Sequence, residues 1–140
     1  MLQEIKKPNQ ESVRGPTGCR FCGLDGTDRV VKKMGTMVAI KDKHPVTESH
    51  MLVIPIRHTP DFLSLTSQER RDAEALILSL KDQITKKDPR VTGFNIGVNC
   101  GVSAGQTIMH AHIHLIPRRD GDTPNPRGGV RGVIPGKRSY

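Results

Sequence analysis

Three histidines recur at every second residue of the sequence, at His110, His112 and His114. Residues two apart in a β-strand project from the same face, so an extended backbone would place the three imidazoles in one row. The residues beside them are apolar and would face the opposite way, toward a core: Met109, Ala111, Ile113 and Leu115. A tag or a loose metal-binding tract lacks this alternation, so the pattern favours a strand with one packing face and one reactive face.

Such a row of imidazoles suits phosphoryl or nucleotidyl transfer. Imidazole has an ordinary pKa of about 6.5, so near neutral pH one histidine can attack phosphorus while a neighbour donates a proton. A covalent phospho-histidine intermediate divides a difficult displacement into two easier steps. Upstream, Gly101 and Gly105 let backbone N–H groups approach a phosphate, and Arg118 and Arg119 add positive charge downstream. We expect Pro117 to end the strand.

The composition indicates one domain with a modest aliphatic core. The chain has 140 residues, of which 34% are hydrophobic and only 3% aromatic. Its 22 basic and 14 acidic residues leave a net charge of +8, which favours polyanionic partners such as nucleotides, polyphosphates or nucleic acid. The scarcity of aromatic residues argues against a module that stacks single-stranded bases.

The start of the sequence lacks the apolar core of a signal peptide, and no apolar run approaches the length of a membrane span. We therefore expect a cytoplasmic protein. Three cysteines are an odd number and do not suggest a disulfide framework. Residues 1–17 are polar and predict an extended N-terminal lead-in.

Cys19 and Cys22 form a Cys-x-x-Cys motif, which is typical of a redox pair or half of a zinc site and also arises by coincidence. The sequence contains no second such motif, so a site with four cysteines is excluded. Two thiolates would need two further ligands, and the plausible donors are histidines.

Alternating apolar residues predict strands at 29–33 and 36–41, joined by a turn at Met34 and Gly35, and further strands at 50–56 and 93–99. Between the last two, Thr66-Ser-Gln-Glu69 is a capping box that predicts the start of a helix. This helix extends to about Lys87 and stops before Pro89. Its buried stripe consists of Ala73, Leu76, Ile77, Leu80 and Ile84. The pattern is that of an α+β domain.

The stretch His110-Ala-His112-Ile-His114-Leu-Ile resembles the signature of the histidine triad family, in which apolar residues separate three histidines. The resemblance extends from the Cys19 region to about Gly121. The run 117–122 is similar to the branch that includes the fragile histidine triad proteins and related dinucleoside polyphosphate hydrolases. The family implies a mainly antiparallel sheet packed against one long helix, here residues 18–122, and a homodimer whose sheets continue across the interface.

The resemblance also implies roles for individual residues. His112 would be the nucleophile, His114 would stabilise charge on phosphate oxygens, and His110 would orient its neighbours. The residues implied in nucleotide binding are Phe21, Ile40, Asp42, Asn99, Gly105, Gln106 and Thr107. Alternative interpretations are open for four of them, since Phe21 and Ile40 also fit a core and Asp42 and Asn99 also fit turns.

In zinc-bearing members of the family, the Cys-x-x-Cys pair is completed by two histidines. On this sequence the matching positions are taken to be His50 and His110. Four protein ligands make such a zinc site structural, not catalytic. The remaining histidine near the strand, His58, is interpreted as a structural residue.

Residues 123–140 are rich in glycine and proline, which disfavours a helix or a central strand. This tail carries four cations, Arg127, Arg131, Lys137 and Arg138, and several apolar residues. Tails of this composition are usually disordered. Our hypothesis is that it folds over a nucleotide site, of its own or of a partner subunit, and that its cations contact distant phosphates.

Three functions fit these features. The first is hydrolysis of dinucleoside polyphosphates, such as diadenosine tetraphosphate, through a nucleotidyl-histidine intermediate. The second is a nucleoside phosphoramidase, which cleaves P–N bonds with the same triad. The third is a non-catalytic module that binds nucleotides or nucleic acid. No magnesium-binding motif is evident, so we expect no metal other than structural zinc.

Overall fold

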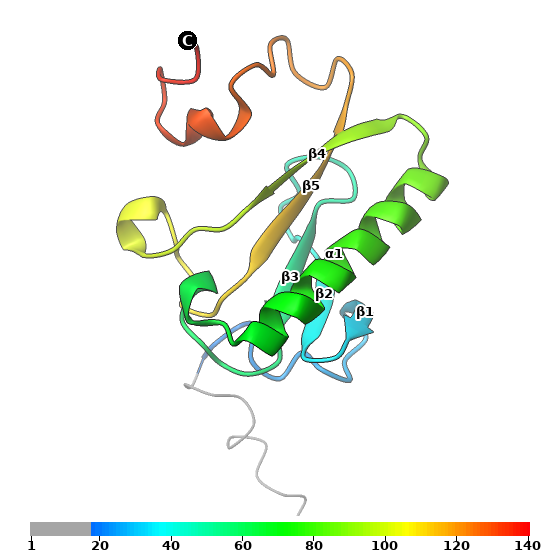
Figure 1. Cartoon of the computed structure of the whole chain (residues 1–140), viewed down its shortest axis with the longest axis vertical. Helices are drawn as coiled ribbons and strands as arrows, with labels where there is room; N and C mark the ends of the chain where they lie inside the picture. Colours follow the sequence, from blue (N-terminus) through cyan, green and yellow to red (C-terminus); the bar gives the residue numbers. More distant parts are fainter. Residues whose placement is uncertain (1–17) are drawn as a thin grey trace, which may run out of the picture.

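The computed structural model describes residues 18–140, and the polar extension expected at residues 1–17 lies outside them. The described chain forms one antiparallel sheet in the spatial order β1-β2-β3-β5-β4, with a single long helix across it (Figure 1). The elements are β1 (Val30–Met34), β2 (Met37–Lys41), β3 (Met51–Pro55), α1 (Ser67–Lys87), β4 (Val91–Gly97) and β5 (Ile113–Arg119). The expected α+β class is confirmed.

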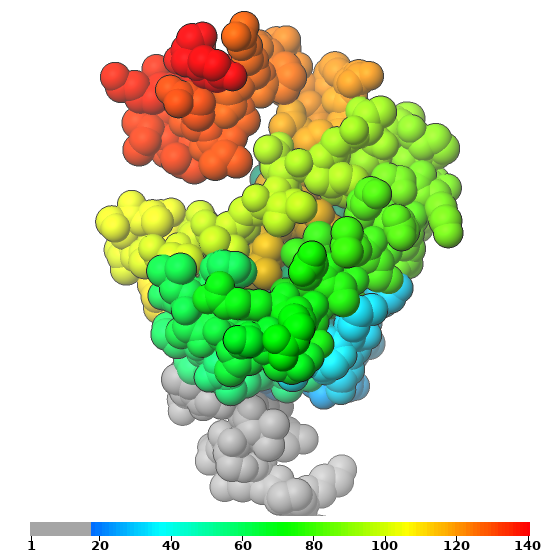
Figure 2. Space-filling view, in the orientation of Figure 1, coloured from blue at the N-terminus to red at the C-terminus, as the bar shows by residue number. Residues whose placement is uncertain are grey.

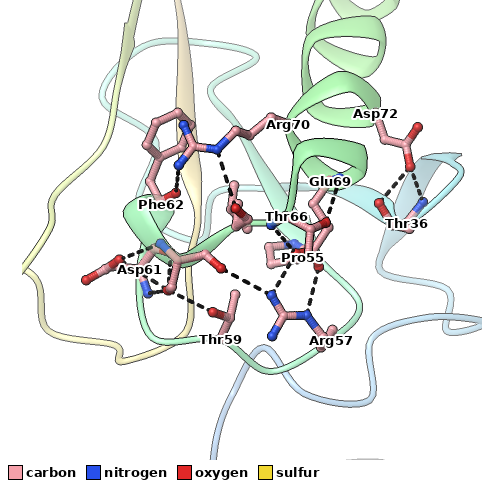
Figure 3. Close-up of polar contacts among 12 residues, drawn as sticks. Thr36, Pro55, Arg57, Thr59, Asp61, Phe62, Thr66, Glu69, Arg70 and Asp72 are labelled. Carbon is pink, nitrogen blue, oxygen red and sulfur yellow. Dashed lines mark hydrogen bonds and ion pairs between the residues drawn. The ribbon is translucent and has the colours of Figure 1, made fainter.

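The hairpin of β1 and β2 turns at Gly35 and Thr36, close to the predicted turn. Gly35 adopts a φ of 54°, and a Cβ there would collide with the carboxylate of Asp72. That carboxylate accepts hydrogen bonds from the backbone N (2.9 Å) and Oγ1 (2.7 Å) of Thr36 (Figure 3). The turn is thereby fastened to the first turns of helix α1.

Helix α1 starts at the predicted capping box. The N–H of Glu69 donates to Oγ1 of Thr66 (3.1 Å), and the N–H of Thr66 donates to Oε1 of Glu69 (2.9 Å). Burial alone would raise the pKa of Glu69, but the donors on Arg57 and Thr66 outweigh it and hold that pKa below its ordinary value. Arg57, which follows β3, lies 2.7 Å from Oε1 of Glu69 and ties the helix to the sheet (Figure 3).

Helix α1 covers one face of the sheet, and residues near Phe21 cover the other. Four residues of the predicted stripe are buried against the sheet, whereas Ile77 is only partly buried. The second face carries a separate apolar cluster of Phe21, Leu24, Val38, Ile40, Leu52 and Ile54. Because side chains alternate along a strand, His114 shares this second face with its cross-strand neighbour Leu52.

Strand β5 begins at Ile113 and continues through Pro117 to Arg119, so the expectation that Pro117 ends it is wrong. Pairing of β5 with β3 stops at Leu115 opposite Met51. The carbonyl of Pro117 therefore accepts from Oγ1 of Thr47 (2.6 Å), in the loop before β3. Proline costs no ladder hydrogen bond to β3 there, because the pairing with β3 has already stopped, while β4 continues alongside with Phe94 opposite Pro117.

The tail forms no α-helix or strand within 123–140, as expected, and its one regular element is a 3-10 turn at Gly129–Val133. This turn contacts β4, and the tail stands as a lobe beyond the end of β5 (Figure 1). The bidentate ion pair of Arg118 with Asp122 (2.8 and 2.7 Å) fixes the direction in which the tail leaves the sheet. No helix among residues 18–140 combines the length and apolar character needed to cross a membrane.

Candidate active site and metal centre

The three histidines do not form the uniform row that the sequence predicts. Only His114 lies in β5, and the other two precede the strand. His110 is fully buried, whereas His112 and His114 are partly exposed, with ring centroids 5.3 Å apart. The first histidine therefore lies in a different environment from the other two.

His112 has its two ring nitrogens in different environments. Its Nδ1 lies 2.9 Å from the backbone carbonyl of His110. A carbonyl can only accept, so Nδ1 carries the proton and Nε2 keeps its lone pair. The imidazole is thus fixed in the tautomer that a nucleophile attacking through Nε2 requires.

His114 is joined to His50 by a hydrogen bond of 2.9 Å, from Nε2 of His50 to Nδ1 of His114. The direction follows from Val46, whose backbone N–H donates to Nδ1 of His50 (3.1 Å) and leaves the His50 proton on Nε2. His114 then accepts at Nδ1 and carries its own proton on Nε2. We name the group of His50, His114 and Asp42 the donor relay; the carboxylate of Asp42 lies 3.4 Å from Nε2 of His50.

Both histidines of the donor relay stay neutral near pH 7. Burial lowers the pKa of His114, and the neighbouring His112 and His50 lower it further. Burial also lowers the pKa of His50, against an opposing effect of Asp42. The donor relay therefore offers hydrogen-bond donors without adding a fixed positive charge.

The loop from Gly101 to Thr107 is held by Gln106. The side-chain oxygen of this buried residue accepts from the N–H of Gly101 (2.8 Å). Its amide nitrogen donates to the carbonyls of Pro60 (2.6 Å) and Ile108 (3.0 Å). The side chain of Gln106 therefore shapes the loop from inside, and its expected contact with a nucleotide stays a prediction. Gly105, with φ of 89°, and the side chain of Thr107 remain exposed.

The other residues implied in nucleotide binding fall into two groups. Phe21 and Ile40 are 6% and 1% exposed and belong to the apolar cluster of the second face. Phe21 also packs edge to face on His112, with 5.1 Å between the ring centroids, so the core interpretation and the nucleotide contact stay open together. Asp42 and Asn99 line a cavity of about 890 Å³ together with His114. Asp42 also accepts from the N–H of His44 (2.8 Å), so it fixes a turn and faces the cavity.

Four potential metal ligands converge behind His112: Cys19, Cys22, His58 and His110. We name this group the Cys₂His₂ cluster. Nδ1 of His110 lies 3.5 Å from each sulfur, and Nδ1 of His58 lies 3.2 Å from Sγ of Cys22 and 3.1 Å from Nδ1 of His110. The expectation that His50 is the fourth ligand is wrong, because His50 is engaged with His114 and Asp42.

The Cys₂His₂ cluster fits a tetrahedral zinc ion. Zinc bound at ordinary distances places sulfur and nitrogen ligands about 3.6 Å apart, close to the separations found here. Nε2 of His110 donates to the carbonyl of Pro55 (2.8 Å), which leaves Nδ1 free for a metal. Burial raises the pKa of the Cys22 thiol to about 12, and proximity to Cys19 adds to this, so a cation is needed to hold thiolates there.

The signal that identifies His58 is the strand register. Leu52 of β3 lies opposite His114 of β5, and the two strands are antiparallel. His110, four residues before His114, is therefore level with the segment that follows Pro55. His58 lies in this segment, whose Thr59 carbonyl accepts from the N–H of Ala111 (2.8 Å). His50, at the opposite end of β3, is too far along the sheet to join the cysteines.

An antiparallel sheet with paired histidines beside a glycine loop defines a class of nucleotide hydrolases and transferases. Residues 25–121 match the family model described as the HIT domain. The chain belongs to this histidine triad family.

Individual relatives agree with this assignment. The chain is 38% identical over 78 residues to the asymmetrical bis(5′-nucleosyl)-tetraphosphatase of Schizosaccharomyces pombe, an alignment covering 56% of this chain and 42% of that protein. It is 34% identical over 120 residues to an AP-4-A phosphorylase of Mycobacterium tuberculosis, covering 84% of this chain and 60% of the relative. The chain thus spans about half the length of these two relatives.

The structure of a HIT family protein from Bacillus anthracis has the same fold. It superimposes with a TM-score of 0.68 at 33% sequence identity, covering 76% of this chain and 77% of that one. The sheet and helix described above are therefore those of the family.

Proposed function

We propose that this protein hydrolyses dinucleoside polyphosphates at the α-phosphate through a nucleotidyl-His112 intermediate. The observation that carries the proposal is the tautomer of His112, whose Nδ1 proton is held by the carbonyl of His110 while Nε2 keeps its lone pair. The net charge of +8 and the names of the two relatives above support a polyanionic nucleotide substrate.

The reaction divides into two displacements. Nε2 of His112 attacks the α-phosphorus, an N–P bond forms, and the P–O bond to the remaining nucleotide breaks with its electron pair on the leaving oxygen. Water then attacks the same phosphorus, the N–P bond breaks, and the proton of the water passes to Nε2 before it leaves for solvent. Nε2–H of His114 and the exposed hydroxyl of Thr107 stabilise the charge on the phosphate oxygens.

The Cys₂His₂ cluster has a structural role in this proposal. Zinc held by all four protein ligands would fix the position of His110 without offering an open coordination position. His110 then holds the tautomer of His112 through its backbone carbonyl. Its own ring takes no proton in either displacement.

A nucleoside phosphoramidase is the second candidate, and the donor relay favours it. An amine departs from phosphorus only after it has gained a proton, whereas a polyphosphate departs as an anion. His114 can supply that proton after taking one up from solvent, because burial lowers its pKa and makes its imidazolium a stronger acid, and on giving up the proton the ring returns to the neutral form that is hydrogen-bonded to His50.

We further propose that the protein acts as a homodimer whose sheets join through β4. The outer edge of β4 pairs with no strand among the described residues, and Ile96 on this strand is 51% exposed. An open edge of this kind is a template for pairing with a second copy.

A parallel assay tests the choice of function. Purified protein is given diadenosine tetraphosphate or adenosine 5′-phosphoramidate, and AMP release is measured for each. Higher kcat/KM on the first substrate supports the leading proposal, and higher kcat/KM on the second supports the alternative. Absence of turnover on both, together with steeply salt-dependent binding of RNA or DNA, would point to a binding module.

A further inference from the structure

His58, Thr59 and Pro60 follow β3 and bind three different parts of the site in succession. The ring of His58 belongs to the Cys₂His₂ cluster. The carbonyl of Thr59 accepts from the N–H of Ala111 (2.8 Å), between the first two histidines of the triad. The carbonyl of Pro60 accepts from Nε2 of Gln106 (2.6 Å). We name these three residues the connector, because each of them is bonded to a different part of the site.

The connector is braced by contacts outside the site, which hold its three residues in a fixed geometry. Thr59 is 2% exposed, and its Oγ1 donates to Oγ of Ser64 (2.8 Å). Arg57, which precedes the connector, donates to Oε1 of Glu69 in helix α1 (Figure 3). Peptide planes and the ring of Pro60 leave few soft dihedral angles within the connector. A displacement of its histidine is therefore passed to the two carbonyls that follow.

Gln106 joins the far end of the connector to the loop from Gly101 to Thr107, which we name the glycine loop. This side chain is 4% exposed, and its Oε1 accepts from the N–H of Gly101 (2.8 Å). The backbone N–H of Gln106 donates to the carbonyl of Gly101 (3.1 Å). A buried polar group left without a partner is costly, so the glycine loop follows the position of Gln106. Figure 2 shows this loop, coloured yellow, lying against the green segment that follows β3.

We propose that Gln106 is a positioning residue which, together with the connector, makes nucleotide affinity depend on whether the Cys₂His₂ cluster holds zinc. This inference rests on the nucleotide binding that the proposed function requires, with phosphate at the glycine loop. When the cluster holds zinc, His58 is fixed, the connector fixes Gln106, and Gln106 fixes the loop in the form that receives phosphate. Coupling between two sites is reciprocal, so a bound nucleotide should tighten zinc binding by the same factor. The metal centre then regulates the site in addition to stabilising the fold.

A second route leads from the Cys₂His₂ cluster to the site, through the carbonyl of His110 and Nδ1 of His112 (2.9 Å). This route holds the tautomer of the proposed nucleophile, so its loss should lower kcat. The connector route holds the glycine loop, so its loss should raise the Kd for a nucleotide. The two routes are therefore distinguished by which constant changes.

The test is Gln106→Met in the full-length protein, which keeps a long side chain and removes its hydrogen-bond donor and acceptor. The Kd for AMP is measured by calorimetry on zinc-loaded protein and again after zinc has been removed with a chelator. In the wild type we expect removal of zinc to raise this Kd about 10-fold, equivalent to about 1.4 kcal/mol. In Gln106→Met the ratio should fall below about threefold, while elemental analysis finds the same zinc content as in the loaded wild type.

Gln83→Met is the matched control, because Gln83 is exposed on helix α1, which covers the opposite face of the sheet. It should keep the wild-type ratio of Kd values. A wild-type Kd that is equal with and without zinc would overturn the inference. So would a Gln106→Met variant that binds AMP more weakly by the same factor in both forms, since Gln106 would then act by contacting the nucleotide.

Circular dichroism at the assay temperature shows whether the zinc-free protein stays folded. If it unfolds, cadmium is exchanged for zinc, because cadmium is a larger ion and soft thiolate ligands also bind it. The Kd for AMP should then differ between the cadmium and zinc forms of the wild type and agree between those of Gln106→Met. Equal values in the wild type, or a difference that persists in Gln106→Met, would overturn the inference. If the wild type cleaves neither substrate but its AMP binding depends on the metal through Gln106, the inference stands and the proposed hydrolysis fails.

Discussion

Histidine side chains serve opposite purposes in the Cys₂His₂ cluster and in the donor relay. The backbone group that is hydrogen-bonded to each ring determines which purpose the ring serves. In the Cys₂His₂ cluster the carbonyl of Pro55 accepts a hydrogen bond from Nε2–H of His110, which leaves the lone pair of Nδ1 available as a ligand. In the donor relay the N–H of Val46 occupies Nδ1 of His50, which puts the proton on Nε2 and makes that atom a donor. An imidazole becomes a ligand or a proton donor according to the group bonded to its other nitrogen.

His112 lies between these two groups. Its Nδ1 depends on the carbonyl of His110, a member of the Cys₂His₂ cluster, and its ring stacks edge to face with His114 of the donor relay, 5.3 Å between centroids. The proposed nucleophile is thus positioned by the Cys₂His₂ cluster on one side and contacts the donor relay on the other. Removing a residue of the Cys₂His₂ cluster should therefore reduce stability, whereas removing a residue of the donor relay should reduce kcat.

The largest expected effect is at His112 itself. His112→Ala removes the nucleophile, so kcat on the better substrate should fall by at least about 10⁴-fold. Zinc content should stay at that of the wild type, because His112 is no ligand. AMP binding by calorimetry should stay within about threefold. Residual turnover near the wild-type rate would place the nucleophile elsewhere.

Removal of a ligand from the Cys₂His₂ cluster has the next largest effect, and it acts on stability. His58→Ala should reduce bound zinc, measured by elemental analysis after dialysis, to well below one ion per chain. The free energy of unfolding should fall by about 4 kcal/mol when free zinc is 1,000 times the wild-type Kd. His50→Ala is the comparison variant and should retain the zinc. Loss of zinc from His50→Ala and not from His58→Ala would reverse the assignment of the two histidines.

A change in the donor relay should slow the chemistry and spare the metal. In His50→Gln, the hydrogen bond to Nδ1 of His114 is weakened and the position of its Nε2 proton is no longer fixed. We expect kcat to fall about 10²-fold with KM within about threefold. The loss should be larger for the phosphoramidate than for diadenosine tetraphosphate, since only the amine must gain a proton. Equal losses on both substrates would limit the donor relay to stabilising charge on the phosphate.

Local signals in the sequence were sufficient for most of the fold. The capping box at Thr66 and Glu69 gave the start of helix α1, and the apolar spacing gave its buried face. The hairpin turn near Gly35 was also predictable, since few residues other than glycine adopt its backbone conformation. These features depend on residues within one or two turns of each other.

The parts of the site that the sequence did not predict depend on pairing between distant segments. The choice of His58 over His50 requires the register of β3 against β5, which residue types alone do not reveal. The role of Gln106 depends on Pro60, 46 positions away in the chain. Pro117 lies inside β5 at a position where pairing with β3 has stopped and only β4 continues alongside. Each of these outcomes was decided by a long-range contact.

The smallest effect we predict is a pH dependence of stability that comes from the donor relay. Burial holds the pKa values of His50 and His114 below the ordinary value of about 6.5, so the folded protein binds fewer protons there than the unfolded chain. Their contribution is fully present above that value and is lost as pH falls through it, at up to about 1.4 kcal/mol per pH unit for each group. Urea unfolding between pH 7.5 and 5.5 measures this slope, which should be smaller in His50→Gln. An equal slope in the two proteins would mean that His50 takes up its proton as readily in the fold as in the unfolded chain, and the donor relay would then carry charge near pH 6.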